Sequence, residues 1–456
     1  MHTLYRIALL HVPLWSIVLI YGVSIWAALF LYMHVHSSPI YDITLPAFAG
    51  GRVSIDYGPQ PSFEDRFYFN SVKEVFVENE SSFILADLTE MEMKFYKDGE
   101  VILSFPIAAK GKEKTWTETP AGLYAVEWKT ESHHSSLYNV TMPYSIQFFG
   151  NYFIHGWPYH PDGRAVVSST SAGCIRLDTD SAAELYRHAR PGMPVLVFEE
   201  SYSRDDFSYF NTVEETTAES YLAIDLKSDF IFSEKRTDGK LSIGSFSRLP
   251  MALIASERMF VGMSVTVPEK AFADSKADSR FRVNEEVTLF TLLGAILMES
   301  SPIASGMVAD RLGKDIRSTL NNYVRALGMK STFIEEPLGA DSNVSTVEDT
   351  VTLSKYLYFN RSSLLEMSEG KITSPYLTSR HSDLSPIHSL DSDPSFVGGY
   401  IPHDGDDFEG FALAIFEPEF SGMKRPVAII VSGSSEPIDD IWKILKSVRL
   451  TSEKTD

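Results

Sequence analysis

Cys174, the only cysteine in this 456-residue chain, is the residue whose type most directly suggests covalent chemistry. It lies in the segment SAGCIRL, and His155 lies 19 residues earlier in FIHGWPY. A thiol becomes a nucleophile where a neighbouring base accepts its proton and backbone N–H groups stabilise the oxyanion. Gly173 removes a side chain where a substrate carbonyl would approach, and the carbonyl of Gly156 could orient the imidazole. A lone cysteine is otherwise a small buried apolar residue, but this setting predicts acyl transfer.

The motifs around this pair occur in a recognisable order. TPAG at 119–122 and MPYSIQFFGNYFIHG precede SAGCIRL, and DSAAELYRHARPGMPVLV follows it. With these motifs, residues 75–200 resemble the L,D-transpeptidase family, whose members cross-link peptidoglycan through a Cys–His pair. Many members have His where this chain has Ala172, but that position varies in the family, so we do not interpret Ala172 as a loss of activity.

The resemblance implies a role for each matching residue. Cys174 would attack the carbonyl that precedes D-Ala in a stem tetrapeptide, with His155 as its base and the Gly156 carbonyl holding the imidazole ring. The backbone N–H groups of Gly173 and Cys174 would bind the oxyanion. The residues expected to shape the substrate pocket are Ser171, Arg176 and Tyr144.

The acyl-thioester has more than one fate. Transfer to the amine of a neighbouring stem gives the 3→3 cross-link of an L,D-transpeptidase, the function that we favour. Discharge to water would make an L,D-carboxypeptidase, and transfer to a protein amine would attach a protein to the wall. A chain with two inert domains would instead be a non-catalytic peptidoglycan-binding scaffold. The expected partners are peptidoglycan stem peptides and, less directly, cell-wall proteins.

Residues 220–449 resemble a second family, the low-molecular-mass penicillin-binding D-Ala-D-Ala carboxypeptidases. The resemblance rests on the segments YLAIDLKSDFIFSEKRTDGKLSIGSFSRLPMALIASE, TLFTLLGAILMESSPIAS and FVGGYIPHDGDDFEGFALAIFE, which occur in the order of that family. It implies an α/β fold of the serine carboxypeptidase and β-lactamase type.

The three catalytic motifs of that second family are altered here. Ser-x-x-Lys becomes Ser245 to Arg248, and arginine stays protonated, so it cannot act as a base. The Ser-x-Asn motif begins at Ser300 but ends in Pro302, and Lys-Thr-Gly is replaced by Val-Gly-Gly, ending at Gly399. We therefore expect an inactive domain in which Ser245 is an ordinary residue at a helix N-terminus.

The N-terminus carries an apolar run, residues 7–35, and no charged residue lies between Arg6 and Asp42. The run is long enough to cross a bilayer, and the charge bias places the N-terminus in the cytoplasm. The protein would then be single-pass, with its bulk outside the cell membrane, or periplasmic where an outer membrane exists. The alternatives are a cleaved signal peptide, with AFA at 47–49 as the cleavage site, and a buried core helix.

The chain as a whole predicts a multidomain α+β protein. The expected parts are a transmembrane anchor at 1–36, a stalk or irregular extension at 37–72, a β-rich catalytic domain at 73–200, a linker at 201–219 and the inactive domain at 220–450. Local patterns predict a hairpin turning at 97–99, a helix beginning at Asp180 or Ser181 and ending before Pro191, a helix within 285–301, strands at 411–417 and 426–433, and a closing helix at 440–448.

Charge and metal-ligand patterns exclude other classes. The net charge of −21 argues against nucleic acid and against anionic membrane surfaces as partners. His133, His134 and His160 lack the paired spacing of metal ligands. The acidic stretch HDGDDFEG at 403–410 could hold calcium, but it lacks the EF-hand spacing and is better explained as a solvated loop. We expect neither a metal nor a cofactor.

Overall fold

The N-terminal domain, residues 57–200, begins the part of the chain that the computed structural model describes. The described residues are 57–113, 115–136, 138–200, 205–209, 215–272, 280–371, 374–404, 407–408 and 410–450. The apolar run for which we expected a membrane anchor lies outside them. Within the described ranges, no helix is both long and apolar enough to cross a membrane.

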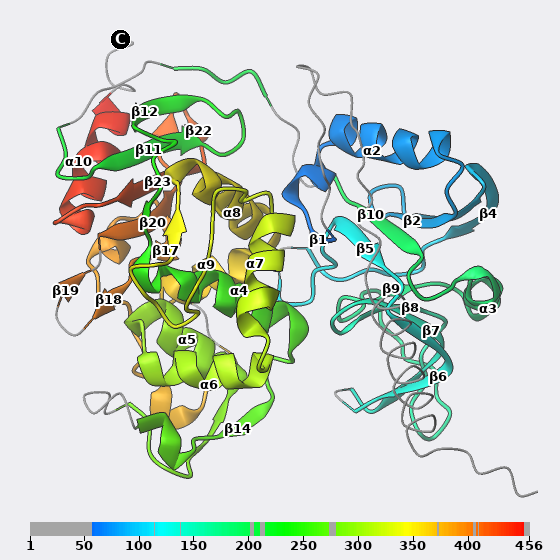
Figure 1. Cartoon of the computed structure of the whole chain (residues 1–456). Coiled ribbons are helices and arrows are strands. Elements are labelled where there is room, and N and C mark those ends of the chain that lie inside the picture. The colour runs from blue at the N-terminus through cyan, green and yellow to red at the C-terminus, as the bar shows by residue number, and fades with distance from the viewer. Residues whose placement is uncertain are drawn as a thin grey trace, which may run out of the picture. The chain divides into compact units, whose positions relative to one another are not determined.

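Two sheets build the N-terminal domain (Figure 1). The six-stranded sheet has the order β1-β5-β10-β2-β3-β4, with strands at Gly58–Pro59, Gly122–Ala125, Pro194–Phe198, Phe83–Asp87, Glu92–Lys97 and Glu100–Pro106. The four-stranded sheet has the order β6-β7-β8-β9, with strands at Trp128–Ser135, Val140–Phe149, Tyr152–His155 and Ile175–Arg176. The hairpin predicted at 97–99 is confirmed: β3 pairs with β4, and Asp98 and Gly99 both have positive φ, as the tight turn requires.

Helix α2, Arg66–Glu78, corrects the last part of the stalk predicted over residues 37–72, of which residues 37–56 lie outside the described residues. The Asp65 carboxylate caps the helix by accepting the first free N–H groups. Phe69, Val72 and Phe76 form its buried stripe, and the ring of Phe69 stacks on Phe198 at 4.5 Å. The prediction was wrong because prolines and glycines earlier in the segment hid a helical apolar period that begins only at Phe69.

Helix α3, Thr179–His188, was predicted with a late start. Asp178 is its N-cap and accepts from the backbone N–H groups of Asp180 and Ser181, the two residues that we had expected in that place. All three residues can cap a helix, so composition alone does not choose among them.

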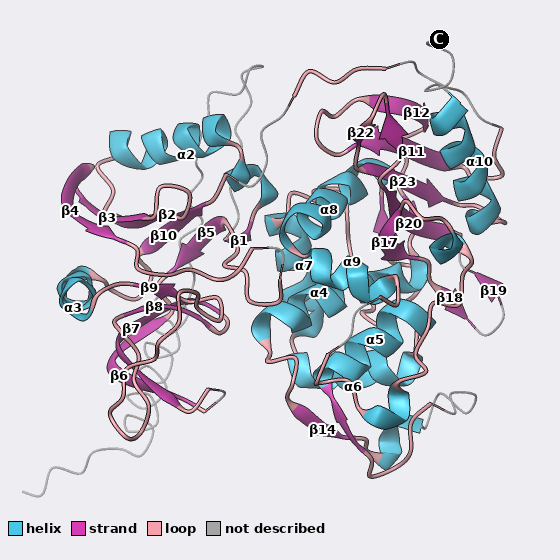
Figure 2. Ribbon diagram, turned by 180° about the vertical axis from the view of Figure 1, so that it is seen from behind, coloured by secondary structure: helices cyan, strands magenta, loops and turns pink. Residues whose placement is uncertain are grey.

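A five-stranded antiparallel sheet forms the centre of the C-terminal domain, residues 215–450 (Figure 2). Its order is β12-β11-β23-β20-β17, with strands at Ile231–Lys235, Ser220–Asp225, Val427–Ser432, Phe411–Phe416 and Phe396–Tyr400. Alternate residues of β23 face opposite cores: Ile430 joins the core that includes helix α8, Val347–Asn360, and Ile429 joins the core under α10, Pro437–Leu450. The strands predicted at 411–417 and 426–433 and the closing helix are confirmed.

The remaining helices pack on the α8 side of this sheet. They are η2 (Gly244–Ser247), α4 (Arg248–Arg258), α5 (Leu289–Glu299), α6 (Pro302–Leu312), α7 (Ile316–Ala326) and α9 (Ser362–Ser368). Short elements complete the described chain: η1 (Pro61–Glu64), β13 (Leu241–Ser242), β14 (Ser264–Thr266), η3 (Glu269–Phe272), β15 (Glu286–Thr288), β16 (Val344–Ser345), η4 (Ser379–His381), η5 (Leu390–Ser392), β18 (His403–Asp404), β19 (Asp407–Phe408), β21 (Glu419–Phe420) and β22 (Met423–Lys424). The helix predicted within 285–301 is α5.

The segment expected as a linker, residues 201–219, contacts the C-terminal domain where it is described. Arg425 pairs with Asp205 at 2.7 Å and with Asp225 at 2.7 Å, and its guanidinium lies 4.2 Å from the ring centroid of Phe207. The hydrogen bond from Arg425 lowers the pKa of Asp205 to about 2. Residues 205–209 are therefore attached to the domain, which their polar composition did not indicate.

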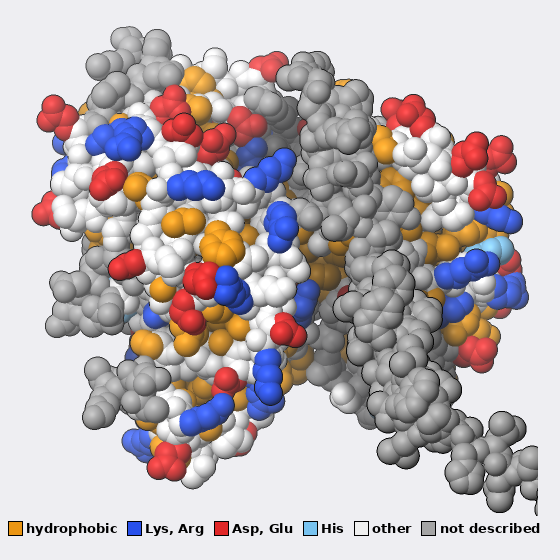
Figure 3. Space-filling view, in the orientation of Figure 1, with side chains coloured by type: hydrophobic (Ala, Val, Ile, Leu, Met, Phe, Trp, Pro, Cys, Tyr) orange, Lys and Arg blue, Asp and Glu red, His pale blue; other side chains and the backbone are white. Residues whose placement is uncertain are grey.

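The surface in the view of Figure 3 intersperses Lys and Arg with Asp and Glu. No patch of one sign dominates the described part of that face.

Replacing Phe69 by alanine should lower the free energy of unfolding by about 3–5 kcal/mol, because a buried ring and its stacking partner are lost. Phe67 on the same helix is 87% exposed, so Phe67→Ala is the matched control and should change stability by less than about 0.5 kcal/mol. Urea denaturation followed by circular dichroism measures both. Equal effects of the two substitutions would contradict the packing of α2.

Candidate active site around Cys174 and His155

His155 ends strand β8, and Cys174 directly precedes strand β9, which runs parallel to β8 in the four-stranded sheet. Strand β8 pairs with β9 in the register Ile154↔Ile175 and His155↔Arg176. His155 therefore lies opposite Arg176, two residues after Cys174, and these two paired side chains project to the same face. The pairing thus brings together the segments of His155 and Cys174, which are 19 positions apart in the sequence.

The imidazole of His155 is buried, with 2% of the residue's surface exposed, and it is oriented by the backbone of the next residue. Its Nδ1 lies 2.6 Å from the carbonyl oxygen of Gly156. A carbonyl only accepts, so Nδ1 carries the proton in this contact and Nε2 is left as the basic nitrogen. Burial lowers the pKa of His155 to about 4, so the ring is neutral at neutral pH and able to take a proton.

The thiol of Cys174 is buried among apolar side chains, with Val140, Met142 and Phe153 as neighbours. Its Sγ lies 3.8 Å from the carbonyl oxygen of Asn151, to which it can donate. Burial raises the pKa of Cys174 to about 11, so the resting group is a thiol. The described contacts of Cys174 include no hydrogen bond to His155.

A small hydrogen-bonded loop precedes the thiol. Ser171 Oγ donates to the Cys174 carbonyl and accepts from the Gly173 N–H at 3.1 Å. Gly173 has φ +106°, and a Cβ there would lie 2.5 Å from the ring of Tyr152, so only glycine fits. The Gly173 N–H, expected to bind an oxyanion, is thus held by Ser171 in this state.

Arg176, which pairs with His155 across β8 and β9, is buried, with 3% of its surface exposed. It donates to the Ser168 carbonyl at 2.8 Å, and its guanidinium lies 5.0 Å from the ring centroid of Trp157. Within the described residues its Nε has no hydrogen-bond partner. Burial lowers the pKa of Arg176, but the group stays a cation.

The ring of Tyr144 contacts helix α3. Tyr144 has φ +52°, a strained value for a non-glycine residue, and its ring lies 5.8 Å from that of Tyr186 on α3. Its backbone lies close to the site, because the Gly156 N–H donates to the carbonyl of Pro143, but among the described residues no side-chain hydrogen bond joins Tyr144 to Cys174 or His155.

Three residues that sequence reasoning did not single out also build the site. Thr119 Oγ1 accepts from the Gly111 N–H at 3.0 Å and donates to the Gly173 carbonyl at 2.8 Å. Asn151 supplies the carbonyl near the thiol, and Trp157 lies against Arg176. The TPAG motif contained the signal for Thr119, but neither Asn151 nor Trp157 lies in a motif with an obvious role.

The first two altered motifs of the C-terminal domain also lie close together, and their side chains are hydrogen-bonded: Arg248 donates to Ser300. Arg248 donates to the carbonyls of Leu338 at 2.8 Å and Ser300 at 2.7 Å, and to Ser300 Oγ at 3.1 Å. Ser300 Oγ in turn lies 3.0 Å from the hydroxyl of Tyr400. Ser245, in η2 directly before α4, is 2% exposed. The guanidinium thus joins α4 to the segments around Leu338 and Ser300.

The third altered motif has little room for a larger side chain at its middle position. A Cβ at Gly398, where the motif has threonine, would lie 2.4 Å from the Leu365 carbonyl oxygen. Gly399 stands at the glycine of the motif itself. Pro302 is the first residue of α6, where its missing N–H costs nothing.

The described residues contain no cluster of side chains typical of a metal site. No group of three or more His, Cys, Asp or Glu residues suited to a metal occurs within the described ranges. The 403–410 stretch forms the short strands β18 and β19 where it is described.

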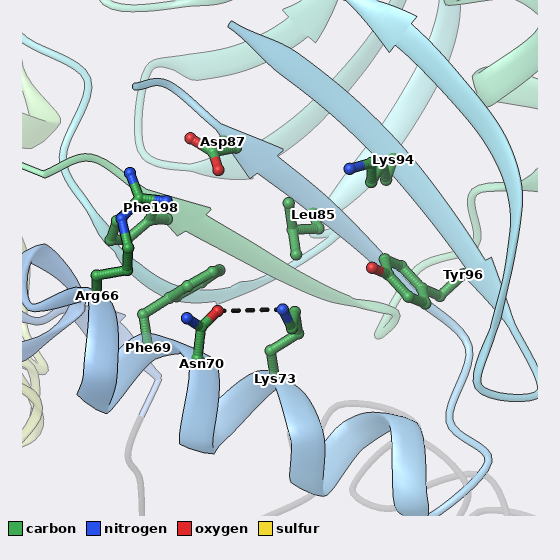
Figure 4. A pocket seen from close by; sticks show the side chains of 9 residues that line it. All are labelled: Arg66, Phe69, Asn70, Lys73, Leu85, Asp87, Lys94, Tyr96 and Phe198. Carbon is green, nitrogen blue, oxygen red and sulfur yellow. Dashed lines mark hydrogen bonds between the residues drawn. The ribbon is translucent and has the colours of Figure 1, made fainter. Parts of the chain in front are cut away.

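A cavity of about 130 Å³ lies between α2 and the strands β2, β3 and β10 (Figure 4). Its cations are already engaged: Arg66 pairs with Glu200, Lys94 with Glu92, and Lys73 bonds Asn70 at 3.1 Å. None of the predicted site residues lines this cavity.

Comparison with known proteins finds a family model that matches each of two segments of the chain. Residues 81–197 match the model of the L,D-transpeptidase catalytic domain, and residues 208–377 match that of D-alanyl-D-alanine carboxypeptidase. The chain therefore combines domains of two families of peptidoglycan enzymes. No curated protein matches it.

Solved structures with similarity to the chain include three of penicillin-binding type. A D-alanyl-D-alanine carboxypeptidase from Mycobacterium tuberculosis H37Rv has 16% identity and a TM-score of 0.46, over 55% of this chain and 97% of that one. Penicillin-binding protein D2 from Listeria monocytogenes, in its ampicillin-bound form, has 21% identity and a TM-score of 0.43, over 51% and 98%. Penicillin-binding protein 6B from Escherichia coli has 20% identity and a TM-score of 0.42, over 54% and 81%.

The buried thiol predicts an unusual pH dependence. Alkylation of Cys174 by iodoacetamide should rise about tenfold per pH unit from about pH 7 to about pH 10, because only the thiolate reacts and the pKa lies at about 11. The urea-unfolded chain is the control, and its rate should level off near about pH 9. A plateau of the folded protein below about pH 9 would contradict the burial of the thiol.

Proposed function

We propose that this protein is a cysteine-dependent L,D-transpeptidase that forms 3→3 cross-links in peptidoglycan. The observation that supports the proposal is the register of β8 and β9, in which His155 pairs with Arg176, two residues after Cys174, while His155 Nδ1 is held by the Gly156 carbonyl. This arrangement provides a nucleophile, a base and an orienting group, as nucleophilic catalysis requires.

The first half of the reaction acylates the protein. The Cys174 sulfur attacks the carbonyl that precedes D-Ala in a stem tetrapeptide, and the thiol proton passes to His155 Nε2. The C–N bond to D-Ala then breaks, and the leaving amine takes the proton from the imidazolium. Release of D-Ala leaves a thioester on Cys174.

The second half transfers the acyl group. The side-chain amine at the third residue of a neighbouring stem attacks the thioester carbonyl and gives its proton to His155. The C–S bond breaks, and the thiolate of Cys174 recovers the proton. The backbone N–H groups of Gly173 and Cys174 would stabilise both oxyanions, which requires Ser171 to release the Gly173 N–H.

Arg176 suits the binding of a stem-peptide carboxylate near the thiol, because its buried cation keeps a free Nε donor within the described residues. The C-terminal domain would contribute no serine chemistry, since Arg248 donates to carbonyls and remains protonated. The apolar run at residues 7–35 would anchor the protein in the cell membrane, with both domains on the side of the wall.

Incubation of the protein with purified tetrapeptide muropeptides should release D-Ala and yield dimers linked between two third residues, as read by mass spectrometry. Cys174→Ala should abolish both products, because no thioester can form. Release of D-Ala without dimers would instead identify an L,D-carboxypeptidase. Absence of any product from the folded protein would favour a non-catalytic scaffold.

A carbapenem should add once to the chain, at Cys174, and the adduct should be absent from Cys174→Ala. Intact-mass measurement followed by peptide mapping locates it. Benzylpenicillin should leave Ser245 unmodified, because Arg248 cannot accept its proton. An adduct on Ser245 would show that the C-terminal domain is active.

A further inference from the structure

We infer that the inactive C-terminal domain positions the catalytic thiol, by holding the two segments that flank Cys174 through Arg258 and Asn360. The inference rests on the proposed function in that Cys174 is taken as the nucleophile. The described residues of both domains belong to one compact unit, Asp42–Asp456, and the contacts below lie within it.

The first contact holds the turn between β7 and β8. The side-chain amide of Asn151 donates to the carbonyl of Arg258, the last residue of α4, at 2.8 Å. The Arg258 guanidinium lies 5.7 Å from the ring centroid of Phe149. The same Asn151 carries the backbone carbonyl that lies 3.8 Å from the Cys174 sulfur. One residue of this turn therefore contacts both the C-terminal domain and the thiol.

The second contact holds the segment on the other side of the thiol. Asn360, the last residue of α8, donates from its side-chain amide to Glu118 Oε1 at 3.2 Å. Glu118 is only 2% exposed and directly precedes Thr119, whose hydroxyl donates to the Gly173 carbonyl. Glu118 and Thr119, which are adjacent in the sequence, thus connect Asn360 of the C-terminal domain to Gly173, the residue before Cys174.

A buried ion pair joins the two contact points behind the interface. Arg361 Nε lies 3.0 Å from Glu257 Oε1, and their side chains are 3% and 1% exposed. Glu257 directly precedes Arg258, and Arg361 directly follows Asn360. The Arg361 guanidinium also donates to the Asn360 carbonyl at 2.9 Å. The two anchors are therefore fixed relative to each other, which a positioning role requires.

Apolar packing makes the interface continuous. Tyr152, whose ring fits against Gly173, belongs to the same buried cluster as Phe149 of its own domain and Ile254 of α4. Two edge-on aromatic contacts also cross between the domains, Trp116 with Phe290 at 5.8 Å and Tyr138 with Phe260 at 6.2 Å. A domain that had lost catalysis and had no other role would have no reason to retain this surface against the active site.

Asn360→Ala and Asn151→Ala test the inference, since each removes one contact and leaves the thiol, the base and the backbone donors in place. Loosening the flanking segments exposes the thiol, so alkylation by iodoacetamide at about pH 8 should rise by about two- to tenfold, the range expected for loss of one hydrogen bond. Acylation of Cys174 by a carbapenem should fall by a similar factor, because the loop that presents the thiol is misplaced.

Two variants of the C-terminal domain serve as controls. Asn322→Ala makes the same chemical change at an exposed position of α7. Ile444→Ala opens a cavity in the fully buried core under α10 and destabilises the domain without touching the interface. The rates of alkylation and of carbapenem acylation should both keep their wild-type values in these controls. Each variant is measured well below its melting temperature, and circular dichroism checks that it is folded.

Opposite changes of the two rates in the interface variants, absent from the controls, support the positioning role. Wild-type rates in folded Asn360→Ala and Asn151→Ala would overturn it. Faster alkylation together with slower acylation in Ile444→Ala would also overturn it, because destabilisation of the C-terminal domain would then explain both changes. Alkylation needs no turnover, so the inference is tested even if the wild-type protein yields no cross-linked product and the proposed function fails.

Discussion

The buried ion pair between Glu257 and Arg361 fixes, within the C-terminal domain, the two places that contact the N-terminal domain, at Arg258 and Asn360. Besides the guanidinium, the Glu257 carboxylate accepts from the hydroxyls of Tyr323 and Tyr356. Burial and the neighbouring carboxylate raise the pKa values of both tyrosines, so all the donors remain protonated. Leaving one charge of such a pair unpartnered costs about 3–5 kcal/mol. The pair therefore holds α4 and the α8–α9 junction together.

Positions where the C-terminal domain departs from the carboxypeptidase motifs also have structural roles. Arg248 stands where the motif has lysine, and its three hydrogen bonds tie α4 to the segments around Leu338 and Ser300. Gly398 stands where the motif has threonine, and its lack of a side chain allows strand β17 to pass close to the Leu365 carbonyl. These two positions therefore support the fold of the domain.

Much of the fold could be predicted because its signals are local. The hairpin at Asp98 and Gly99, the apolar period of α5 and the buried strands near the C-terminus depend on neighbouring residues alone. Helix α2 was missed because its stripe begins inside a segment rich in proline and glycine. The attachment of residues 205–209 was missed because Asp205 finds its partner, Arg425, 220 positions away.

The sequence by itself determined which residues are candidates for the chemistry: the order of its motifs singled out Cys174 and His155. Arg248 and Pro302 argue against a second site, since residue type alone decides what can act as a base. Only the tertiary structure decided how the thiol is held. It buried Cys174 and raised its pKa, placed the ring of Tyr144 beside Tyr186 of α3, and brought Arg258 and Asn360 to the flanking segments. Burial and contact between distant segments depend on the whole packed chain, and no local pattern encodes them.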